Sequence, residues 1–223
     1  MGGVAAGPFA RDPEHPNLTI TRHPLIEHKV SRLRSVDTSK KVFKELVDEI
    51  AQLLAYEVTA DLPTRPVKVR TPLESMEGSE VDGAGIVIVP VLRAGLGMVE
   101  GILRLIPTAR VGHIGLQRDH DTLEPADYYF KIPSGVEDSL HIVTDPMLAT
   151  GGSASAAVSF LERRGARSIR LMVIVAAPEG VRRMAEDHPE VPVYAAALDR
   201  ELNDRGYILP GLGDAGDRLF GTD

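Results

Sequence analysis

The 223-residue sequence contains no cysteine, which excludes disulfide bonds, thiolate catalysis and cysteine-based zinc sites. This absence fits the reducing cytoplasm, and we expect a cytoplasmic protein. Long apolar runs are also missing, because a run such as Leu171 to Ala177 is far shorter than the roughly 18 residues that a membrane-spanning helix needs. The opening segment "MGGVAAGPFARDPEHP" lacks the basic start and the apolar stretch of a secretory signal. We therefore expect no membrane partner.

An excess of basic residues is absent too. The sequence has 25 Lys and Arg against 32 Asp and Glu, which gives a formal net charge of −7. This balance disfavours a general nucleic-acid binder, which would carry a basic surface, so we expect no nucleic-acid partner. It does not argue against a small polyanionic substrate, because a few well-placed arginines suffice to bind one.

Several motifs of known chemistry are missing from the sequence. The seven histidines are scattered without the spacing of metal ligands, and the Gly-x-x-x-x-Gly-Lys-Ser/Thr phosphate loop does not occur. The run "GGSAS" is not a Gly-x-Ser-x-Gly nucleophile elbow, because Ser155 replaces its second glycine. The chemistry must therefore come from other loops.

Short apolar runs alternate with helical patterns along most of the chain. The spacing of apolar residues from Asp37 to about Val58 predicts a helix, which Asp37 or Thr38 would cap. Three prolines that follow it, at positions 63, 66 and 72, are expected to break regular structure. Further helical patterns surround Met98, Val158 and Met184. Continuous apolar runs predict strands at residues 85–92, 109–118, 140–144, 168–177 and 191–199.

This alternation of strands and helices predicts an α/β fold with a mostly parallel central sheet flanked by helices. In such a fold, ligands bind in the loops that follow the carboxyl ends of the strands. The segment of residues 1–22 shows neither pattern, and we interpret it as a flexible tail.

One loop of this kind is "VTDPMLATGGS", residues 143–153, which joins an apolar run to a segment with helical spacing. The first N–H groups of a helix have no internal partner, and the helix dipole attracts an anion there. Adjacent glycines let the backbone approach closely, while two hydroxyls add donors. Asp145, a few residues earlier, could hold a pair of hydroxyls. The segment is either a plain strand-to-helix turn or a cradle for a ribose 5-phosphate.

A second loop follows the run that ends at Leu92. It contains "GLGMVEG", residues 95–101, and Asp119 ends the next predicted strand, which loosely resembles a dinucleotide-binding fingerprint. Against that interpretation, the glycine spacing differs and Arg93 lies between the strand and the glycines. Arg93 and Arg118, at neighbouring strand ends, could pair with the same pyrophosphate.

The third candidate loop is the stretch "GYILPGLGDAGDRLFGTD", residues 206–223. We expect it to be too rich in glycine for a helix and to offer exposed main-chain amides to a ligand. A simple coil is the alternative interpretation.

Together these segments resemble the uracil phosphoribosyltransferase family. The resemblance runs from about His23 to residue 223 and predicts a single phosphoribosyltransferase domain over residues 23–223. It rests on the segments "HPLIEHKVSRLR", "LLAYEVTADLP", "VPVLRAGLGM", "LEPADYYFKIP", "DPMLATGGS", "VAAPEG" and "GYILPGLGDAGDRLFGT". The implied fold is the type I phosphoribosyltransferase sheet with a small hood formed by the N- and C-terminal segments.

The resemblance implies a role for each matching residue. Arg93 and Arg118 would bind diphosphate, and Asp145 would hold the ribose hydroxyls. The ribose-phosphate segment would be Asp145, Pro146, Met147, Leu148, Ala149, Thr150, Gly151, Gly152 and Ser153. The uracil-binding residues would be Ile208, Gly213, Asp214 and Ala215, with Asp214 also at the diphosphate. A hairpin around Tyr128 to Lys131 would form a mobile flap.

The implied reaction joins uracil to 5-phosphoribosyl 1-diphosphate (PRPP) and yields UMP and diphosphate, as in pyrimidine salvage. The implied catalytic residues are Arg118, Asp145 and Asp214. Mg²⁺ is the implied cofactor and would be held mainly through PRPP, with Asp214 as a candidate ligand. The family also implies a homodimer or higher homo-oligomer and, in some members, a GTP effector.

Three alternatives come from other classes of protein. One is a regulator with the same fold that senses nucleotides and binds RNA, which the negative charge disfavours. Another is a dinucleotide-dependent oxidoreductase, which would leave the phosphate loop after residue 145 unexplained. A purine-specific transferase is the third, but many such enzymes carry two adjacent acids where this chain has Thr144 before Asp145.

Overall fold

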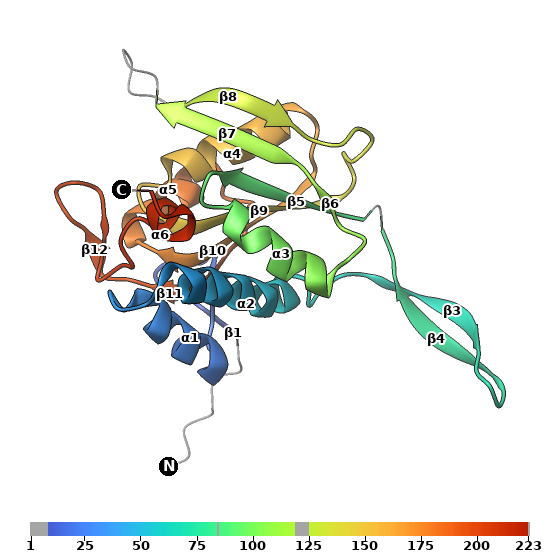
Figure 1. Ribbon diagram of the computed structural model, residues 1–223. Helices are drawn as coiled ribbons and strands as arrows, with labels where there is room; N and C mark the ends of the chain where they lie inside the picture. Colours follow the sequence, from blue (N-terminus) through green and yellow to red (C-terminus); the bar gives the residue numbers. More distant parts are fainter. Residues whose placement is uncertain (1–8, 84, 119–124, 223) are drawn as a thin grey trace.

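The computed structural model describes residues 9–83, 85–118 and 125–222, and Figure 1 shows how their helices and strands are arranged. The strands are β1 (Phe9–Arg11), β2 (Leu18–Thr21), β3 (Thr64–Arg70), β4 (Ser75–Val81), β5 (Ile86–Leu92), β6 (Arg110–Val111), β7 (His113–Arg118), β8 (Pro125–Lys131), β9 (Leu140–Leu148), β10 (Ser168–Ala176), β11 (Val193–Leu198), β12 (Glu201–Leu202) and β13 (Ile208–Leu209). The helices are α1 (Pro24–Arg34), α2 (Lys40–Val58), α3 (Leu96–Leu105), α4 (Gly152–Arg163), α5 (Pro178–Asp187) and α6 (Ala215–Phe220).

The central sheet has the strand order β1-β2-β11-β10-β9-β5-β7-β8, with β6 paired to β5. Every neighbouring pair from β2 to β7 along this path is parallel, while β1 and β8 run antiparallel to their neighbours at the two edges. The mostly parallel α/β fold expected from the sequence is confirmed.

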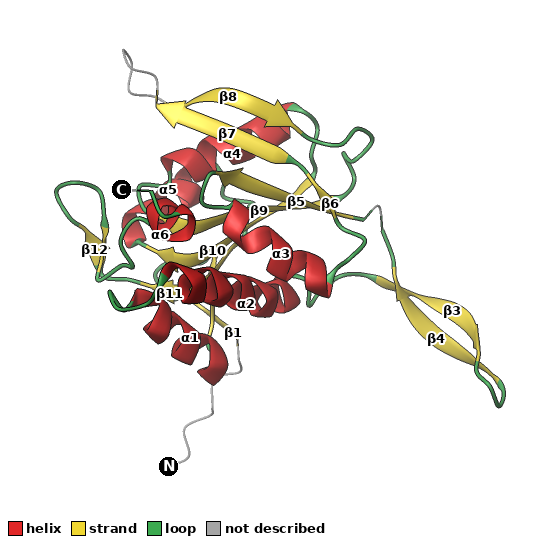
Figure 2. Ribbon diagram, in the orientation of Figure 1, coloured by secondary structure: helices red, strands yellow, loops and turns green. Residues whose placement is uncertain are grey.

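The central strands are apolar throughout because helices cover both faces of the sheet. On β5, Ile86 and Ile88 pack in one core with α1, α2, α3 and α6, whereas Val87 and Val89 pack in the other core with α4 and α5. Figure 2 shows α2 and α3 in front of the sheet and α4 and α5 behind it. Successive residues of a strand point to opposite faces, so a strand buried on both sides has no polar alternation.

The chain leaves β5 and β9 in opposite directions across the sheet. After β5 it continues to β7 on one side, whereas after β9 it continues to β10 and β11 on the other side. β5 and β9 are neighbours in parallel register, with Pro90 opposite Thr144. A crevice opens at the carboxyl ends of adjacent strands where the winding reverses, and ligands of open α/β sheets bind there.

The predicted helix after Asp37 exists, but it begins later than expected. The hydroxyl of Ser39, rather than Asp37 or Thr38, accepts the N–H of Val42 and caps α2. The helix packs tightly on α3, because a Cβ on Gly101 would collide with the main-chain carbonyl of Asp48.

The flexible tail predicted for residues 1–22 does not extend through β1 and β2. Residues 18–21 pair in parallel with β11, and Leu18 is fully buried. The N–H of Val193 also donates to the carbonyl of Asn17, at 2.8 Å. A four-residue strand is too short to produce a periodicity that a sequence pattern can reveal. Residues 1–8 lie outside the described part of the chain.

The prolines after α2 do not exclude regular structure there. Pro66 lies within β3, opposite Ser79 of β4, in a two-stranded hairpin that projects from the rest of the molecule (Figure 1). Because a two-stranded ribbon leaves one edge of each strand unpaired, the missing N–H of a proline can face that edge. Leu73, at the turn, is 96% exposed.

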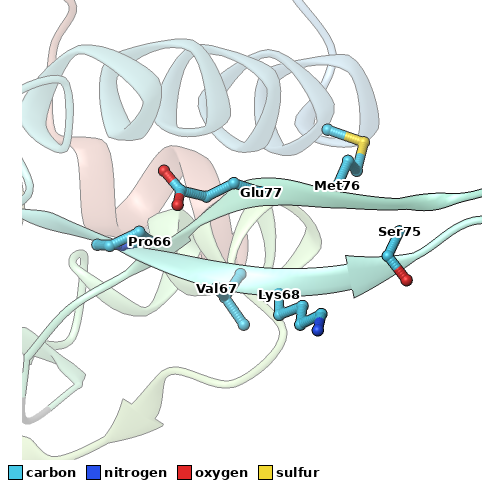
Figure 3. Close-up of a pocket in the computed structure, with 6 residues that line it drawn as sticks. All are labelled: Pro66, Val67, Lys68, Ser75, Met76 and Glu77. Carbon is cyan, nitrogen blue, oxygen red and sulfur yellow. The ribbon is translucent and has the colours of Figure 1, made fainter.

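A hollow of about 430 Å³ lies on this hairpin and is lined by Pro66, Val67, Lys68, Ser75, Met76 and Glu77. Figure 3 shows that the charged ends of Glu77 and Lys68 point away from each other, so the polar groups do not converge on a common point. The hollow lacks the arrangement that a small-molecule site needs.

Among the described helices, none combines the length and the apolar character required to cross a membrane.

Truncation of Leu18 tests whether β2 belongs to the core. Leu18→Ala should lower the free energy of unfolding by about 2–5 kcal/mol, as expected for a fully buried leucine. Urea denaturation measures the effect, and Leu25→Ala, at a position that is 54% exposed, is the control that should change little. Equal, small effects of the two substitutions would show that residues 18–21 are not packed in the sheet.

Candidate active site

Three segments meet at the crevice between β5 and β9. β5 ends at Leu92 and is followed by Arg93, β9 carries Asp145 and leads into α4, and the segment before α6 contributes Asp214. Asp145 and Asp214 lie close enough to interact electrostatically, although 69 positions separate them in the sequence. The fold therefore brings together the first and third loops that the sequence singles out.

The segment after β9 forms one side of a cavity of about 210 Å³. Most of the predicted ribose-phosphate residues line it, whereas Pro146 does not and is buried instead. The lining residues are Asp145, Met147, Leu148, Ala149, Thr150, Gly151, Gly152, Ser153, Ala154, Arg205 and Gly206.

The N-terminus of α4 is left open toward this cavity. Gly151 precedes the helix with φ of 77°, and no side chain in the described residues caps the helix at this position. Thr150 Oγ1 lies 3.4 Å from the N–H of Gly152 and provides only a weak contact. An uncapped helix start of this kind offers N–H donors and the positive end of the helix dipole to an anion.

The loop needs glycine because α5 packs against it. A Cβ on Gly151 would lie 2.9 Å from the carbonyl oxygen of Gly180, and a Cβ on Gly180 would lie 2.9 Å from that of Leu148. Behind the loop, the hydroxyl of Ser155 donates to Asp187 at 2.6 Å and lowers the pKa of that carboxyl. Helix α5 therefore supports the open end of α4 from the side opposite the cavity.

Asp145 is half-buried at the crevice. Its Oδ1 accepts the N–H of Met147 at 3.2 Å. Burial of the carboxyl raises its pKa from the ordinary 3.8 to about 7; the Met147 hydrogen bond opposes this rise and the nearby Asp214 carboxylate adds to it. The carboxyl group thus titrates near neutrality, where a cationic or hydrogen-bond-donating ligand would favour its ionised form.

Arg93 reaches from the end of β5 to α6. Its guanidinium lies 3.4 Å from Asp217 Oδ1 and 3.5 Å from Thr222 Oγ1, and its side chain is 56% exposed. Because Gly216 lies between Arg93 and Asp214, with no side chain to separate them, a guanidinium and a carboxylate flank the start of α6. The weak, exposed ion pair leaves Arg93 available for a stronger anion.

Arg118, which is predicted to bind diphosphate together with Arg93, lies at the end of the neighbouring strand. β7 ends at Arg118 and pairs with β5, but the side chain of Arg118 lies outside the described residues, as does Asp119. The predicted hairpin around Tyr128 to Lys131 exists as β7 and β8, which pair antiparallel. The Arg164 guanidinium stacks 3.9 Å from the centre of the Phe130 ring and joins this hairpin to α4. Mobility of the hairpin stays a prediction.

The stretch of residues 206–223, which we expected to be too rich in glycine for a helix, contains the helix α6, and this corrects the prediction. Asp214 caps α6 by accepting the N–H of Asp217 at 2.9 Å, and the short helix buries Ala215 and Leu219. Five glycines in the stretch do not prevent this, because most of them lie outside the helix and Gly211, Gly213 and Gly221 adopt positive φ. Of the predicted uracil residues, Ile208 and Ala215 have buried side chains, whereas Gly213 and Asp214 are exposed.

Arg205 is a site residue that the sequence did not single out. It lines the phosphate-sized cavity together with Gly206, in the loop between β12 and β13. This loop is anchored to α5, where Glu179 Oε1 accepts the N–H of Leu202 at 3.1 Å. An arginine in a polar loop has no sequence signal of its own; only the folded hairpin places it over the start of α4.

The glycines of "GLGMVEG" serve packing rather than dinucleotide binding. A Cβ on Gly95 would collide with the carbonyl of Thr144, one on Gly97 would lie 2.8 Å from Leu219, and Gly101 faces α2. Each glycine thus allows a neighbouring element to approach closely. This use of the glycines disfavours the oxidoreductase alternative.

The donor set suits a metal ion that arrives with a phosphorylated ligand. In the described residues, no three His, Asp or Glu side chains form a cluster that could hold a metal by themselves. Asp145 and Asp214 are nevertheless two carboxylates at the same crevice. Mg²⁺ is commonly bound by one or two carboxylates together with substrate phosphates, so these residues fit that cation.

The comparisons with known proteins decide the family. The sequence model for uracil phosphoribosyltransferase matches residues 20–222. The chain belongs to the uracil phosphoribosyltransferase family. Within this family, the enzyme from Listeria innocua is 55% identical over 206 residues, which cover 92% of this chain and 99% of that one. The enzyme from Caldanaerobacter subterraneus is 56% identical, with 92% and 98% covered.

Two solved structures share the fold of this chain. The AQ2163 protein from Aquifex aeolicus superposes with a TM-score of 0.86 and is 37% identical, with 92% of this chain and 99% of that chain covered. A hypoxanthine phosphoribosyltransferase from Trypanosoma cruzi has a TM-score of 0.50 at 14% identity, with 71% of this chain and 76% of that chain covered. The second likeness concerns the fold alone and is consistent with a type I phosphoribosyltransferase fold.

The raised pKa of Asp145 predicts a pH-dependent stability. Between about pH 4 and about pH 7 the folded protein keeps a proton that the unfolded chain has released, so the free energy of unfolding should fall as pH rises through this window. Asp145→Asn should remove this component and flatten the pH profile, as measured by urea denaturation. Asp214→Asn should lower the Asp145 pKa, read from the carboxyl ¹³C shift. A midpoint near the ordinary 3.8 in the unmodified protein would contradict the argument.

Proposed function

We propose that this protein transfers the phosphoribosyl group of PRPP to uracil and forms UMP and diphosphate. One observation carries the proposal: the uncapped start of α4 opens into the cavity that Asp145 and Arg205 line. In this proposal the helix start would receive the 5-phosphate, Asp145 the ribose hydroxyls, and the segment from Gly213 to Ala215 the flat base. The family relatives named above carry the same activity in their names.

The 5-phosphate would lie on the residues from Thr150 to Ser153. The N–H groups at the start of α4 would donate to its oxygens, and the hydroxyls of Thr150 and Ser153 would add two donors. Arg205, above the same cavity, would supply a positive charge. Asp145 would accept hydrogen bonds from the ribose hydroxyls in its ionised form.

The diphosphate would lie between the ends of β5 and β7. Departure of diphosphate from the anomeric carbon builds negative charge on the leaving group, so catalysis requires cations that are already in place. Arg93 and Arg118 would supply them, with Asp214 at the same edge. Mg²⁺ bound with PRPP would neutralise part of the diphosphate charge.

Uracil would be held by main-chain groups of Ile208 and the segment from Gly213 to Ala215. Its acceptor–donor–acceptor edge matches N–H, C=O and N–H groups. A main-chain group that is held in place cannot exchange donor for acceptor as an Asn side chain can by flipping. Cytosine would leave buried groups unpaired, which can cost roughly 10⁴-fold in kcat/KM. The pocket would therefore select uracil through its backbone.

Closure of the hairpin β7–β8 over the site would exclude water and limit hydrolysis of PRPP. A homo-oligomer and a GTP effect, which the family resemblance implies, stay predictions. The cytoplasmic location also stays a prediction.

A base panel tests the proposal directly. The protein, Mg²⁺ and PRPP should give the monophosphate with uracil and roughly 10⁴-fold less product with cytosine, hypoxanthine or adenine. Product is measured by chromatography against a reaction without PRPP. Efficient turnover of a purine, or of no base at all, would refute the proposed function.

Substitutions at the diphosphate edge should slow the reaction without unfolding the protein. Arg118→Ala and Asp214→Ala should each lower turnover with uracil by about 10²–10³-fold, because each removes a group that stabilises charge in the transition state. Asp204→Ala, at an exposed acid in the loop between β12 and β13, is the control. Near-normal turnover in both site variants would show that the assigned roles are wrong.

Arg205→Ala should raise the KM for PRPP by about tenfold and leave the KM for uracil unchanged, because a charge-assisted phosphate contact is lost. Arg200→Ala is the matched control: Arg200 is another exposed arginine of the same segment, and it pairs with Glu201. An unchanged KM for PRPP in Arg205→Ala would place this arginine outside the phosphate site.

A further inference from the structure

A buried ion pair lies behind the proposed uracil loop and belongs to neither substrate site. Arg34, at the end of α1, donates two parallel hydrogen bonds to the Asp199 carboxylate, at 2.8 Å to Oδ2 and 2.6 Å to Oδ1. The Asp199 side chain is 4% exposed and the Arg34 side chain is 23% exposed. Two-point contact between a guanidinium and a carboxylate fixes orientation as well as distance.

Both polar main-chain groups of Gly211 are held by this pair. The N–H of Gly211 donates to Asp199 Oδ2 at 2.8 Å, and its carbonyl accepts from Arg34 Nη1 at 2.7 Å. The pair and the peptide groups therefore form a closed ring of hydrogen bonds. One residue of the loop is fixed in position and in rotation.

A second arginine holds the next residue of the loop. Arg218 donates to the carbonyl of Leu212 at 2.8 Å and to that of Ser35 at 2.6 Å, and its guanidinium stacks 4.3 Å from the centre of the Phe43 ring. Leu212 itself is buried. The main chain is thus fixed immediately before Gly213.

The backbone at Gly211 accepts no other residue. Its φ is 63°, and a Cβ there would collide with the carbonyl of Ile208. Ile208 precedes the clamped residue and the segment from Gly213 to Ala215 follows it, so the groups proposed to read the base lie on both sides of Gly211. A main-chain donor can discriminate between bases only when its direction is fixed, because an amide that can rotate matches either base.

We propose that the Arg34–Asp199 pair is a positioning device for base recognition, which sets the uracil-reading main chain through Gly211. This inference rests on the proposed function and assigns a task to residues outside the site. Neither side chain is a catalytic residue. The pair acts on uracil through the loop and does not act on PRPP.

The inference predicts a selective kinetic defect. Arg34→Ala should lower kcat/KM for uracil by about 10²-fold, since a displacement of about 1 Å at a reacting group can cost that much. The KM for PRPP should change by less than about twofold, and discrimination against cytosine should weaken. Arg34→Lys should give an intermediate defect, because an ammonium keeps the charge but cannot make the two-point contact.

Lys29 provides a matched control on the same helix. Its side chain is also 23% exposed, and it pairs with Glu49 at 2.6 Å without touching the loop. Lys29→Ala should leave the kinetic constants for both substrates unchanged. If Lys29→Ala reproduces the uracil defect, the effect belongs to α1 as a whole and the inference is overturned.

A double substitution separates positioning from stability. Replacing a buried ion pair by apolar residues of similar size is often neutral for stability, whereas removal of one partner leaves a buried charge alone. Arg34→Met combined with Asp199→Leu should therefore be closer in urea midpoint to the unmodified protein than Arg34→Ala, while the uracil defect persists. Recovery of kcat/KM for uracil in the double variant would show that the pair only stabilises the fold.

The activity of the unmodified protein separates failure of the proposed function from failure of the positioning role. If it does not convert uracil and PRPP, the proposed function fails before the variants are considered. If it does so, and Arg34→Ala and Arg34→Lys both keep its kcat/KM for uracil and its preference over cytosine, the positioning role alone is refuted.

Discussion

The parallel pairing of β5 and β9 is the constraint on which the site depends. Because Pro90 lies opposite Thr144, both strands end at the same edge of the sheet, and the chain then turns away from the crevice on both sides. Helices cover both faces of the two strands, and this packing holds the strand ends in position. Arg93 and Asp145 come together for this reason and not because of any attraction between them.

The two proposed binding segments differ in how the fold supports them. The cradle at the start of α4 is local, since the strand, the glycines and the helix that form it are consecutive in the chain. The loop at Gly211 is not local, because its polar groups are held by side chains from α1 and from the end of β11. Main-chain groups contact the ligand in both proposals, and side chains mostly orient the main chain.

Segments whose structure is local in the sequence could be predicted, whereas segments held by distant residues could not. Continuous patterns mark the strands around residues 86–92 and 140–148 and the helix that begins at Gly152. The sheet and the strand-to-helix junction before α4 could therefore be predicted from the residues alone. The short strand at Leu18, the proline within β3 and the helix at Ala215 could not, because tertiary contacts stabilise them against weak or contrary local preferences.

The arginines show the limit of sequence reasoning for the site. Arg93 directly follows a buried apolar strand, where a charged residue is unusual and therefore indicates a functional site. Arg205 lies in a polar loop, where an arginine is ordinary, and only the anchoring of β12 to Glu179 places it over the cavity. In the sequence, Arg34 is an ordinary basic residue near the C-terminus of a helix, where such residues stabilise the helix dipole. No sequence pattern connects it to its partner Asp199.

The 177 positions that separate Arg34 from Gly211 also affect how the molecule matures on the ribosome. The strand β9 and the helix α4 leave the exit tunnel before β10, α5 and β11. The base-reading loop is translated long afterwards and must then find a helix that was made early, at the entropic cost of closing a large loop. In a nascent chain, the loop at Gly211 can therefore take its final position only after most of the sheet has been made.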